Sequence, residues 1–137
     1  MTGGPQYLLV VFLVERRDGP PVSSGAVADA LGRSPAATTE MLQRLESRGL
    51  VTYEPYDGAT LTDEGRATAA ELYEAYETLS RFFRDVLELE EYEREAMELA
   101  GAVSPTVIDR LESTLLTVGD SSGETRASLP SALSDSR

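Results

Sequence analysis

The sequence predicts a mainly α-helical fold with one small β-hairpin, and three observations support this prediction. Two short helical segments follow one another over residues 23–48, with a tight turn at Gly32 between them. Residues 50–62 then alternate like strands around the turn-forming pair Asp57-Gly58. From Asp63 onward, apolar residues recur at helical spacing. We therefore divide the 137 residues into segments 1–62, 63–118 and 119–137.

The first helix is expected over residues 6–17. The run Tyr7 to Val14 is almost entirely apolar, and no polar face begins before Glu15. Such a helix should be covered on several sides, by its own chain and by a second copy. The run is too short to span a bilayer. Because there is neither a signal peptide nor any cysteine, the sequence predicts a cytoplasmic protein.

The next two helices form a helix-turn-helix unit. Ser23 and Ser24 can cap the first of them, which Gly32 ends. Ser34 followed by a proline starts the second, which should run to Gly49. Its inward face is predicted to be Thr38, Met41, Leu42 and Leu45. The opposite face has small side chains near the start of the helix and polar side chains further along, as suits a helix that binds in a DNA major groove.

The hairpin completes the pattern. Leu50–Tyr53 should form one strand, Asp57-Gly58 the turn and Thr60–Thr62 the return strand, with Thr62 capping the following helix. Helix, helix and hairpin in this order make a winged helix-turn-helix. The segments LESRGLVTYE and LTDEGR are typical of that superfamily, so we predict binding to double-stranded DNA.

The predicted DNA contacts come from the start of the first helix of the unit, the turn, the second helix and the wing. Thr39, Glu40 and Gln43 are expected to reach base edges. The other predicted contacts serve phosphates or the minor groove, or line the approach of the helix. The complete set is Ser24, Arg33, Ser34, Ala36, Ala37, Thr39, Glu40, Gln43, Arg44, Tyr56, Asp57 and Gly58.

The region 63–118 is predicted to be a helical dimerisation region. A long helix over Asp63–Glu88 has an apolar stripe, made of Leu72, Tyr73, Tyr76, Leu79, Phe83, Val86 and Leu87. With the first helix, this stripe predicts a homodimer. The acidic run from Glu88 to Glu98 is expected to be a solvated face that can also collect K+ or another hard cation. The serine- and glycine-rich segment 119–137 is expected to be disordered.

The charge of the chain is unusual for a DNA-binding protein. It has 24 acidic and 12 basic residues, a net charge of −12, and every basic residue is an arginine. The excess is uneven: residues 1–62 have seven acids and five arginines, and residues 63–118 have fourteen and five. An acidic surface without lysine indicates adaptation to molar salt, where repulsion between carboxylates is screened.

The stretch from Tyr7 to Leu116 resembles the iron- and manganese-dependent repressors related to diphtheria toxin repressor and the manganese transport regulator. The segments VADALGRSPAATTEMLQRLESRGLVTYEPYDGATLTDEGR and SPTVIDRL carry the resemblance. It implies a two-fold dimer built by the later helices. It also implies a transition metal between the first helix and those helices, which sets the spacing of the recognition helices. We expect no counterpart of the SH3-like C-terminal domain that longer members have.

The metal ligands of that family do not carry over. Matched one by one, their positions fall on Gln6, Leu9, Tyr76, Ser80, Glu93, Met97, Ala100 and Gly101. Only Glu93 is a good hard ligand, and the chain has no histidine or cysteine. We therefore expect no metal, no cofactor and binding to DNA without a transition metal.

Catalysis has no support in the sequence, because there is neither a phosphate-binding glycine loop nor a histidine for a general base. The preferred function is a sequence-specific transcriptional regulator. Two alternatives stay open. One is a winged-helix module that binds protein partners, and the other is a regulator that senses a small organic ligand in a dimer-interface pocket.

Overall fold

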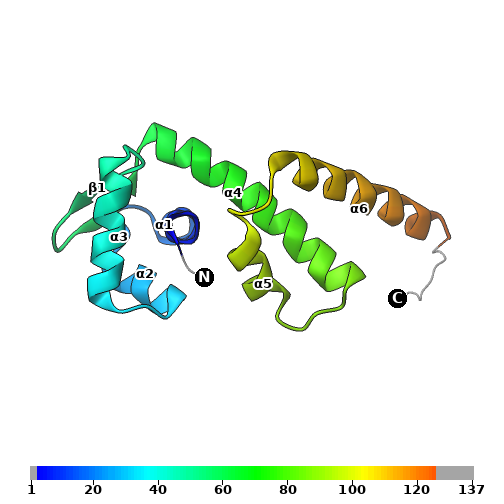
Figure 1. Cartoon of the computed structure of the whole chain (residues 1–137), viewed down its shortest axis with the longest axis horizontal. Coiled ribbons are helices and arrows are strands. Elements are labelled where there is room, and N and C mark those ends of the chain that lie inside the picture. Colours follow the sequence, from blue (N-terminus) through cyan, green and yellow to red (C-terminus); the bar gives the residue numbers. More distant parts are fainter. Residues whose placement is uncertain (1–2, 126–137) are drawn as a thin grey trace.

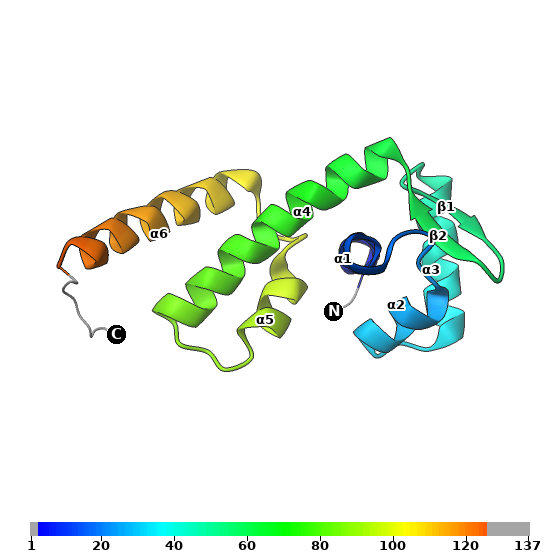
Figure 2. The ribbon, with the colours of Figure 1, turned by 180° about the vertical axis from the view of Figure 1, so that it is seen from behind.

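The computed structural model describes residues 3–125, with side chains up to Leu115. The elements, in order, are α1 (Gly4–Asp18), α2 (Ser24–Leu31), α3 (Pro35–Ser47), β1 (Val51–Glu54), β2 (Gly58–Leu61), α4 (Asp63–Arg81), the π-helical turn η1 (Phe82–Val86), α5 (Tyr92–Leu99) and α6 (Pro105–Thr125). The winged helix lies at one end, and α4 leads from it to α5 and α6 at the other (Figures 1 and 2). The predicted fold class is confirmed.

The helices begin at caps that the sequence predicts. Ser23 Oγ accepts a hydrogen bond from Ala26 N at 3.0 Å, and Ser34 Oγ accepts one from Ala37 N at 3.1 Å. Thr62 Oγ1 starts α4 in the same way, through Gly65 N at 3.0 Å. Each cap satisfies a backbone N–H that the first turn of a helix leaves without a partner.

Helix α1 is the centre of the core. Its residues from Gln6 to Phe12 are all buried, because α1 packs against α2, α3, β2 and α4. In Figure 1 it is seen end-on between the helix-turn-helix and α4. The prediction that this helix also packs on a second copy is therefore wrong for Tyr7–Phe12: their own chain covers them.

The wing differs from the predicted hairpin. The strands pair Val51 with Leu61 and Glu54 with Gly58, so the loop is residues 55–57 and not the pair Asp57-Gly58. Gly58 begins β2 at a φ of +126°, where a Cβ would lie 2.2 Å from the carbonyl oxygen of Val22. Val22 and Ala59 exchange two backbone hydrogen bonds of 2.8 Å. The glycine is needed for this close backbone approach and not for the turn.

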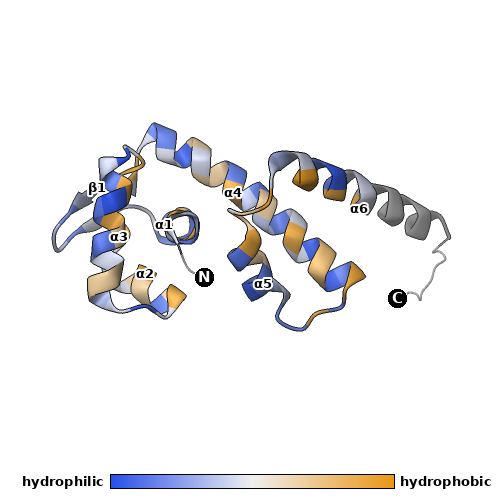
Figure 3. Ribbon diagram, viewed as in Figure 1, coloured by the Kyte–Doolittle hydropathy of each residue, from blue (hydrophilic) through white to orange (hydrophobic). Residues whose placement is uncertain are grey.

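Helix α4 is amphipathic, and hydrophilic and hydrophobic residues alternate along it in Figure 3. Leu79 and Phe83 of the predicted stripe are buried against the core, whereas Val86 and Leu87 are 45% and 49% exposed. The α-helix ends at Arg81 and not at Glu88, since residues 82–86 form a π turn. A π turn departs from the α-helical spacing of side chains, so Val86 at its end and Leu87 after it do not continue the packed stripe.

The C-terminal helix is longer than expected. The predicted disordered tail began at residue 119, but α6 continues to Thr125. Extending a helix adds one hydrogen bond per residue without a new nucleation step, so a polar sequence can continue an existing helix. Residues 126–137 of the predicted tail lie outside the described residues. Within the described range, no helix is both long and apolar enough to cross a membrane.

Candidate functional site

Helix α3 has the two faces that its sequence predicts. Thr38, Leu42 and Leu45 are at most 1% exposed and pack inward, with Met41 half-buried beside them. Of the predicted outer face, Thr39 is half-buried and the others are exposed: Ala36, Ala37, Glu40, Gln43 and Arg44. The inner face anchors the helix, and the outer face is available to a ligand.

The outer face of α3 forms a shallow hollow. It is lined by Pro35, Ala36, Ala37, Thr39, Glu40 and Gln43. The small residues near the helix start permit close approach of another surface. Glu40 and Gln43, three residues apart, lie on one side of the helix, and within residues 3–125 neither side chain makes a hydrogen bond. Their polar groups are therefore available to bases, as a carboxylate accepts from cytosine and an amide pairs with adenine.

The other predicted contacts lie around this hollow. Arg33 and Ser34 are exposed in the turn between α2 and α3, and Ser24 is half-buried at the start of α2. The oxygen of Ser34 already accepts the capping hydrogen bond from Ala37 N. The Ser34 hydroxyl can therefore donate its hydrogen to a phosphate, or accept a second hydrogen bond on the same oxygen. The structure brings these residues to the side of the molecule that carries α3.

The wing tip consists of Tyr56 and Asp57. Tyr56 is fully exposed and has a φ of +74°, a left-handed conformation that is uncommon for a residue with a side chain. Asp57 is also exposed, but Gly58 is buried against the backbone of Val22. Gly58 therefore has a structural role in the wing, and its contact with DNA stays a prediction that its burial does not favour.

A buried carboxylate outside the predicted set of site residues holds the base of the wing. Glu15 of α1 is 6% exposed; its carboxylate pairs with Arg66 Nη1 at 2.5 Å and accepts from Leu61 N at 3.3 Å. These bonds join α1, β2 and α4, and a buried carboxylate needs such partners. The signal in the sequence was an acidic residue directly after an apolar helical run.

A second polar junction joins α1 to α5. Gln6 Nε2 donates to the carbonyl oxygens of Met97 at 3.1 Å and Glu98 at 3.0 Å, while Gln6 Oε1 accepts from Gly3 N at 2.9 Å. Beside it, a Cβ on Gly101 would lie 2.4 Å from Cβ of Pro5. The start of α1 and the end of α5 are therefore in direct contact.

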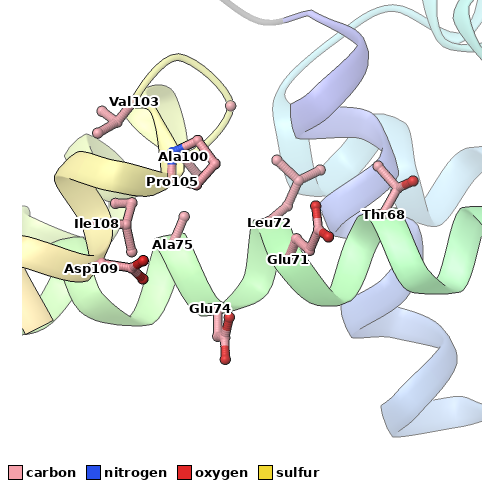
Figure 4. A pocket seen from close by; sticks show the side chains of 11 residues that line it. Thr68, Glu71, Leu72, Glu74, Ala75, Ala100, Val103, Pro105, Ile108 and Asp109 are labelled. Atoms are coloured by element: carbon pink, nitrogen blue, oxygen red, sulfur yellow. The ribbon is translucent and has the colours of Figure 1, made fainter.

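A groove lies between α4 and α6 (Figure 4). Leu72 and Ala75 of α4 and Ile108 of α6 supply its apolar part, and Glu71 and Asp109 its acidic edge. Ala100, Gly101 and Pro105 also line it. The groove is on the helical region and away from the outer face of α3.

Together, the exposed face of α3, the wing and the capped turn define a winged helix-turn-helix DNA-binding protein with a helical region attached. Residues 5–59 match the family model for the iron dependent repressor N-terminal DNA binding domain, and residues 62–119 match the model for its metal binding and dimerisation domain. The chain belongs to the iron-dependent repressor family. Members of this family are DNA-binding transcriptional regulators and not enzymes.

Relatives and solved structures agree with this assignment. The chain is 32% identical over 108 residues to an uncharacterised HTH-type transcriptional regulator of Methanocaldococcus jannaschii, covering 77% of this chain and 86% of the relative. It is 32% identical over 75 residues to MntR of Bacillus subtilis, covering 55% of this chain and 51% of MntR. The structure of the manganese regulator SloR superposes with a TM-score of 0.73 at 28% identity, covering 84% of this chain and 54% of SloR. The chain thus spans about half the length of that solved relative.

The family model names metal binding, but the matched positions do not fit a transition metal. Gln6 is engaged by three hydrogen bonds, and Leu9 and Ala100 supply only apolar side chains in the core. Burial and the nearby Glu93 raise the pKa of Tyr76 above its ordinary value, so its phenol stays neutral and is a poor ligand. Among the described residues, no three acidic, histidine or cysteine side chains cluster around one point.

Ser80 and Met97 do not restore the site. Ser80 lies one turn beyond Tyr76 on α4 and is half-buried, and Met97 offers one thioether on α5. Gly101 has no side chain, and Pro5 occupies the space into which one would point. The inherited position therefore has a single exposed carboxylate, Glu93, and no set of converging donors.

Proposed function

We propose that this protein is a homodimeric regulator that binds operator DNA through α3 and the wing, without a transition metal, in a cytoplasm of high salt. The observation that carries the proposal is the combination of a free polar face on α3 with a ligand position filled by hydrogen bonds and packing. The protein has polar side chains that can contact bases on α3, but over the described residues it does not have a set of side chains that could coordinate a transition metal.

In the proposed complex the outer face of α3 enters the major groove. Thr39, Glu40 and Gln43 contact base edges. Ser24, Arg33 and Arg44 contact phosphates, and Tyr56 and Asp57 of the wing lie at the minor groove. Ser34, Ala36 and Ala37 line the approach. The exposure of these residues supports this arrangement, apart from the half-buried Ser24 and Thr39.

Dimerisation is proposed through the helices after residue 62. The matched family domain is named for dimerisation. In the single chain, the side chains of Leu99 and Val107 are 39% and 47% exposed. Val86 and Leu87 are exposed to a similar degree. Exposed apolar side chains of this kind are available to a second copy. Tyr7–Phe12 of α1 are left out of the proposed dimer contact, because their own chain covers them.

High-salt adaptation is supported by the placement of the acidic residues. The run Glu88, Glu90, Glu91, Glu93, Glu95 and Glu98 is exposed throughout. At molar salt the Debye length is about 3 Å, so repulsion along such a surface is largely screened. K+ or another cation associated with this face belongs to the same proposal.

The test is an operator titration with and without metal. Genomic fragments that bind in molar KCl supply the operator, and affinity is measured after exhaustive chelation and again with Mn2+ or Fe2+ at constant ionic strength. We expect affinities within twofold, with Mg2+ as the control for a general divalent effect. A tenfold gain with Mn2+ or Fe2+, about 1.4 kcal/mol of coupling, would contradict the proposal.

A further inference from the structure

The Gln6 side chain is an unusual link between distant parts of the chain. It lies in the first turn of α1 and is 7% exposed. Its partners Met97 and Glu98 are 91 and 92 positions away in the sequence. Both hydrogens of the amide nitrogen are used, and the amide oxygen accepts from Gly3. The amide is therefore fully engaged between two domains.

The two acceptors belong to the end of α5. Met97 and Glu98 lie in the last turn of this helix, where carbonyl groups have no partner within the helix. A carbonyl that is shielded from water and has no partner is costly, so the Gln6 amide, whose two bonds are partly buried, acts as a cap that α1 supplies to α5. Its orientation follows from chemistry, because the opposite orientation would place the amide oxygen against two carbonyl oxygens.

Close packing accompanies this cap. Gly101 follows α5 directly, and an added Cβ there would lie 2.4 Å from Cβ and 2.8 Å from Cγ of Pro5. Atoms this close cannot coexist without a shift of α1 or of the turn after α5. The absence of a side chain at Gly101 thus lets the first turn of α1 approach the end of α5 closely enough for the Gln6 bonds.

We infer that Gln6, Pro5 and Gly101 form a clamp that fixes the DNA-binding domain on the dimerisation domain by neutral hydrogen bonds and packing. In the family resemblance a metal joins these same elements. The clamp rests on the proposed metal independence and explains how the arrangement is kept without an ion. Gln6 is a positioning residue, since it orients the domain that carries α3 and does not reach DNA itself.

The most informative substitution is Gln6→Glu. A carboxylate of the same shape can still accept from Gly3 N, and a negative charge in the first turn of α1 is favourable. It cannot donate to Met97 and Glu98, and it repels their carbonyl oxygens. The substitution therefore keeps the start of α1 and removes only the link to α5, which separates the clamp from the folding of α1.

The readout is the distance between the domains within one chain. The chain has no cysteine, so Ser47→Cys on α3 and Glu112→Cys on α6, both at exposed positions, permit spin labelling. Labelled chains are diluted with unlabelled protein so that only distances within a chain contribute. In metal-free molar KCl we expect Gln6→Glu to broaden the distance distribution and lower operator affinity at least tenfold, with unchanged helix content. Gln43→Glu, the same change at the other glutamine, is the control for stability and distance.

A second pair of variants tests the packing half of the clamp and does not depend on Gln6→Glu folding. Gly101→Ala should broaden the distance distribution, and Pro5→Gly together with Gly101→Ala should restore it, because the double change removes the colliding Cβ. An unchanged distribution in both Gln6→Glu and Gly101→Ala would overturn the clamp. The metal titration of the unchanged protein judges metal independence separately, since the distances are measured without metal.

Discussion

The two halves of this protein, residues 1–62 and 63–118, differ in charge balance and in the groups at their candidate functional positions. Residues 1–62 are nearly balanced in charge, with seven acids and five arginines, and they leave a free polar face on α3. Residues 63–118 carry fourteen acids and five arginines, and their matched ligand positions hold packed, hydrogen-bonded or uncharged groups apart from Glu93. In the proposed function, the first half supplies the polar groups that read DNA, and packing together with the Gln6 hydrogen bonds takes the place of metal ligands between the two halves.

This contrast separates two requirements of such a regulator. Reading DNA needs particular polar groups at particular positions of one helix. Holding two domains in a fixed arrangement needs only sufficient free energy, which a metal, hydrogen bonds or packing can each supply. The first requirement permits few residue types at the reading positions of α3. The second permits residues that are not metal ligands, such as Gln6 and Gly101, at the positions where the family has ligands.

The largest loss of stability is expected from a substitution at the contact between the two halves, and Gly65→Ala tests this. Gly65 starts α4, and a Cβ there would lie 1.8 Å from the carbonyl oxygen of Leu50. Because both sides of this contact are backbone, we expect a loss of about 3 kcal/mol of unfolding free energy. Urea denaturation in molar KCl measures it. Gly25→Ala, at a glycine with open space around it, is the control, and equal stability of the two variants would refute the close approach.

The elements that local chemistry specifies were predictable. Ser23, Ser34 and Thr62 cap helices as their residue types indicate, and the spacing of Thr38, Leu42 and Leu45 gave the correct inner face of α3. These signals lie within a few residues of what they determine. Capping and helical periodicity can therefore be read from one sequence.

The features that were missed depend on contacts between distant segments. Gly58 looks like a turn glycine, but its conformation serves the backbone of Val22. The family resemblance matches Gln6 and Met97 to one ligand site, but the residues around Gln6 do not indicate that its amide donates to the carbonyls of Met97 and Glu98. The buried state of α1 was predicted, yet the sequence could not tell whether its own chain or a second copy provides the cover.

The second prediction tests whether the first half reads sequence by the proposed face. The double change Glu40→Ala and Gln43→Ala should relax base preference at up to two positions per half-site, because each good side-chain pair contributes about 1–3 kcal/mol of discrimination. Selection from randomised DNA measures the preference. Glu95→Ala on α5, an exposed acidic position away from α3, should leave the preference intact. An unchanged preference in the double variant would show that the reading face lies elsewhere.

The smallest expected effect concerns salt, and it follows from the same contrast in charge. A basic repressor releases counterions for each phosphate it neutralises, which gives a slope of about −0.9 per contact between log affinity and log salt. In the proposed complex, Arg33 and Arg44 meet DNA together with Glu40 and Asp57, and all four residues are exposed in the free chain. Cations must then be taken up between carboxylates and phosphates on binding, and this uptake opposes the release. We expect a shallow slope between half-molar and two-molar KCl, measured by fluorescence anisotropy, and a steep negative slope would contradict it.

Two single neutralisations show which half sets that slope. Glu54→Gln changes an exposed residue at the base of the wing loop, and Glu95→Gln changes an exposed residue of α5. The Debye length is about 3 Å at molar salt, so only carboxylates close to the phosphates take up cations when DNA binds. Glu54→Gln should therefore make the slope more negative, by less than one cation per protomer, while Glu95→Gln leaves it unchanged. Equal shifts in the two variants would mean that the acidic excess acts through the whole molecule, and the division between a reading half and a solvated acidic half would fail for the electrostatics.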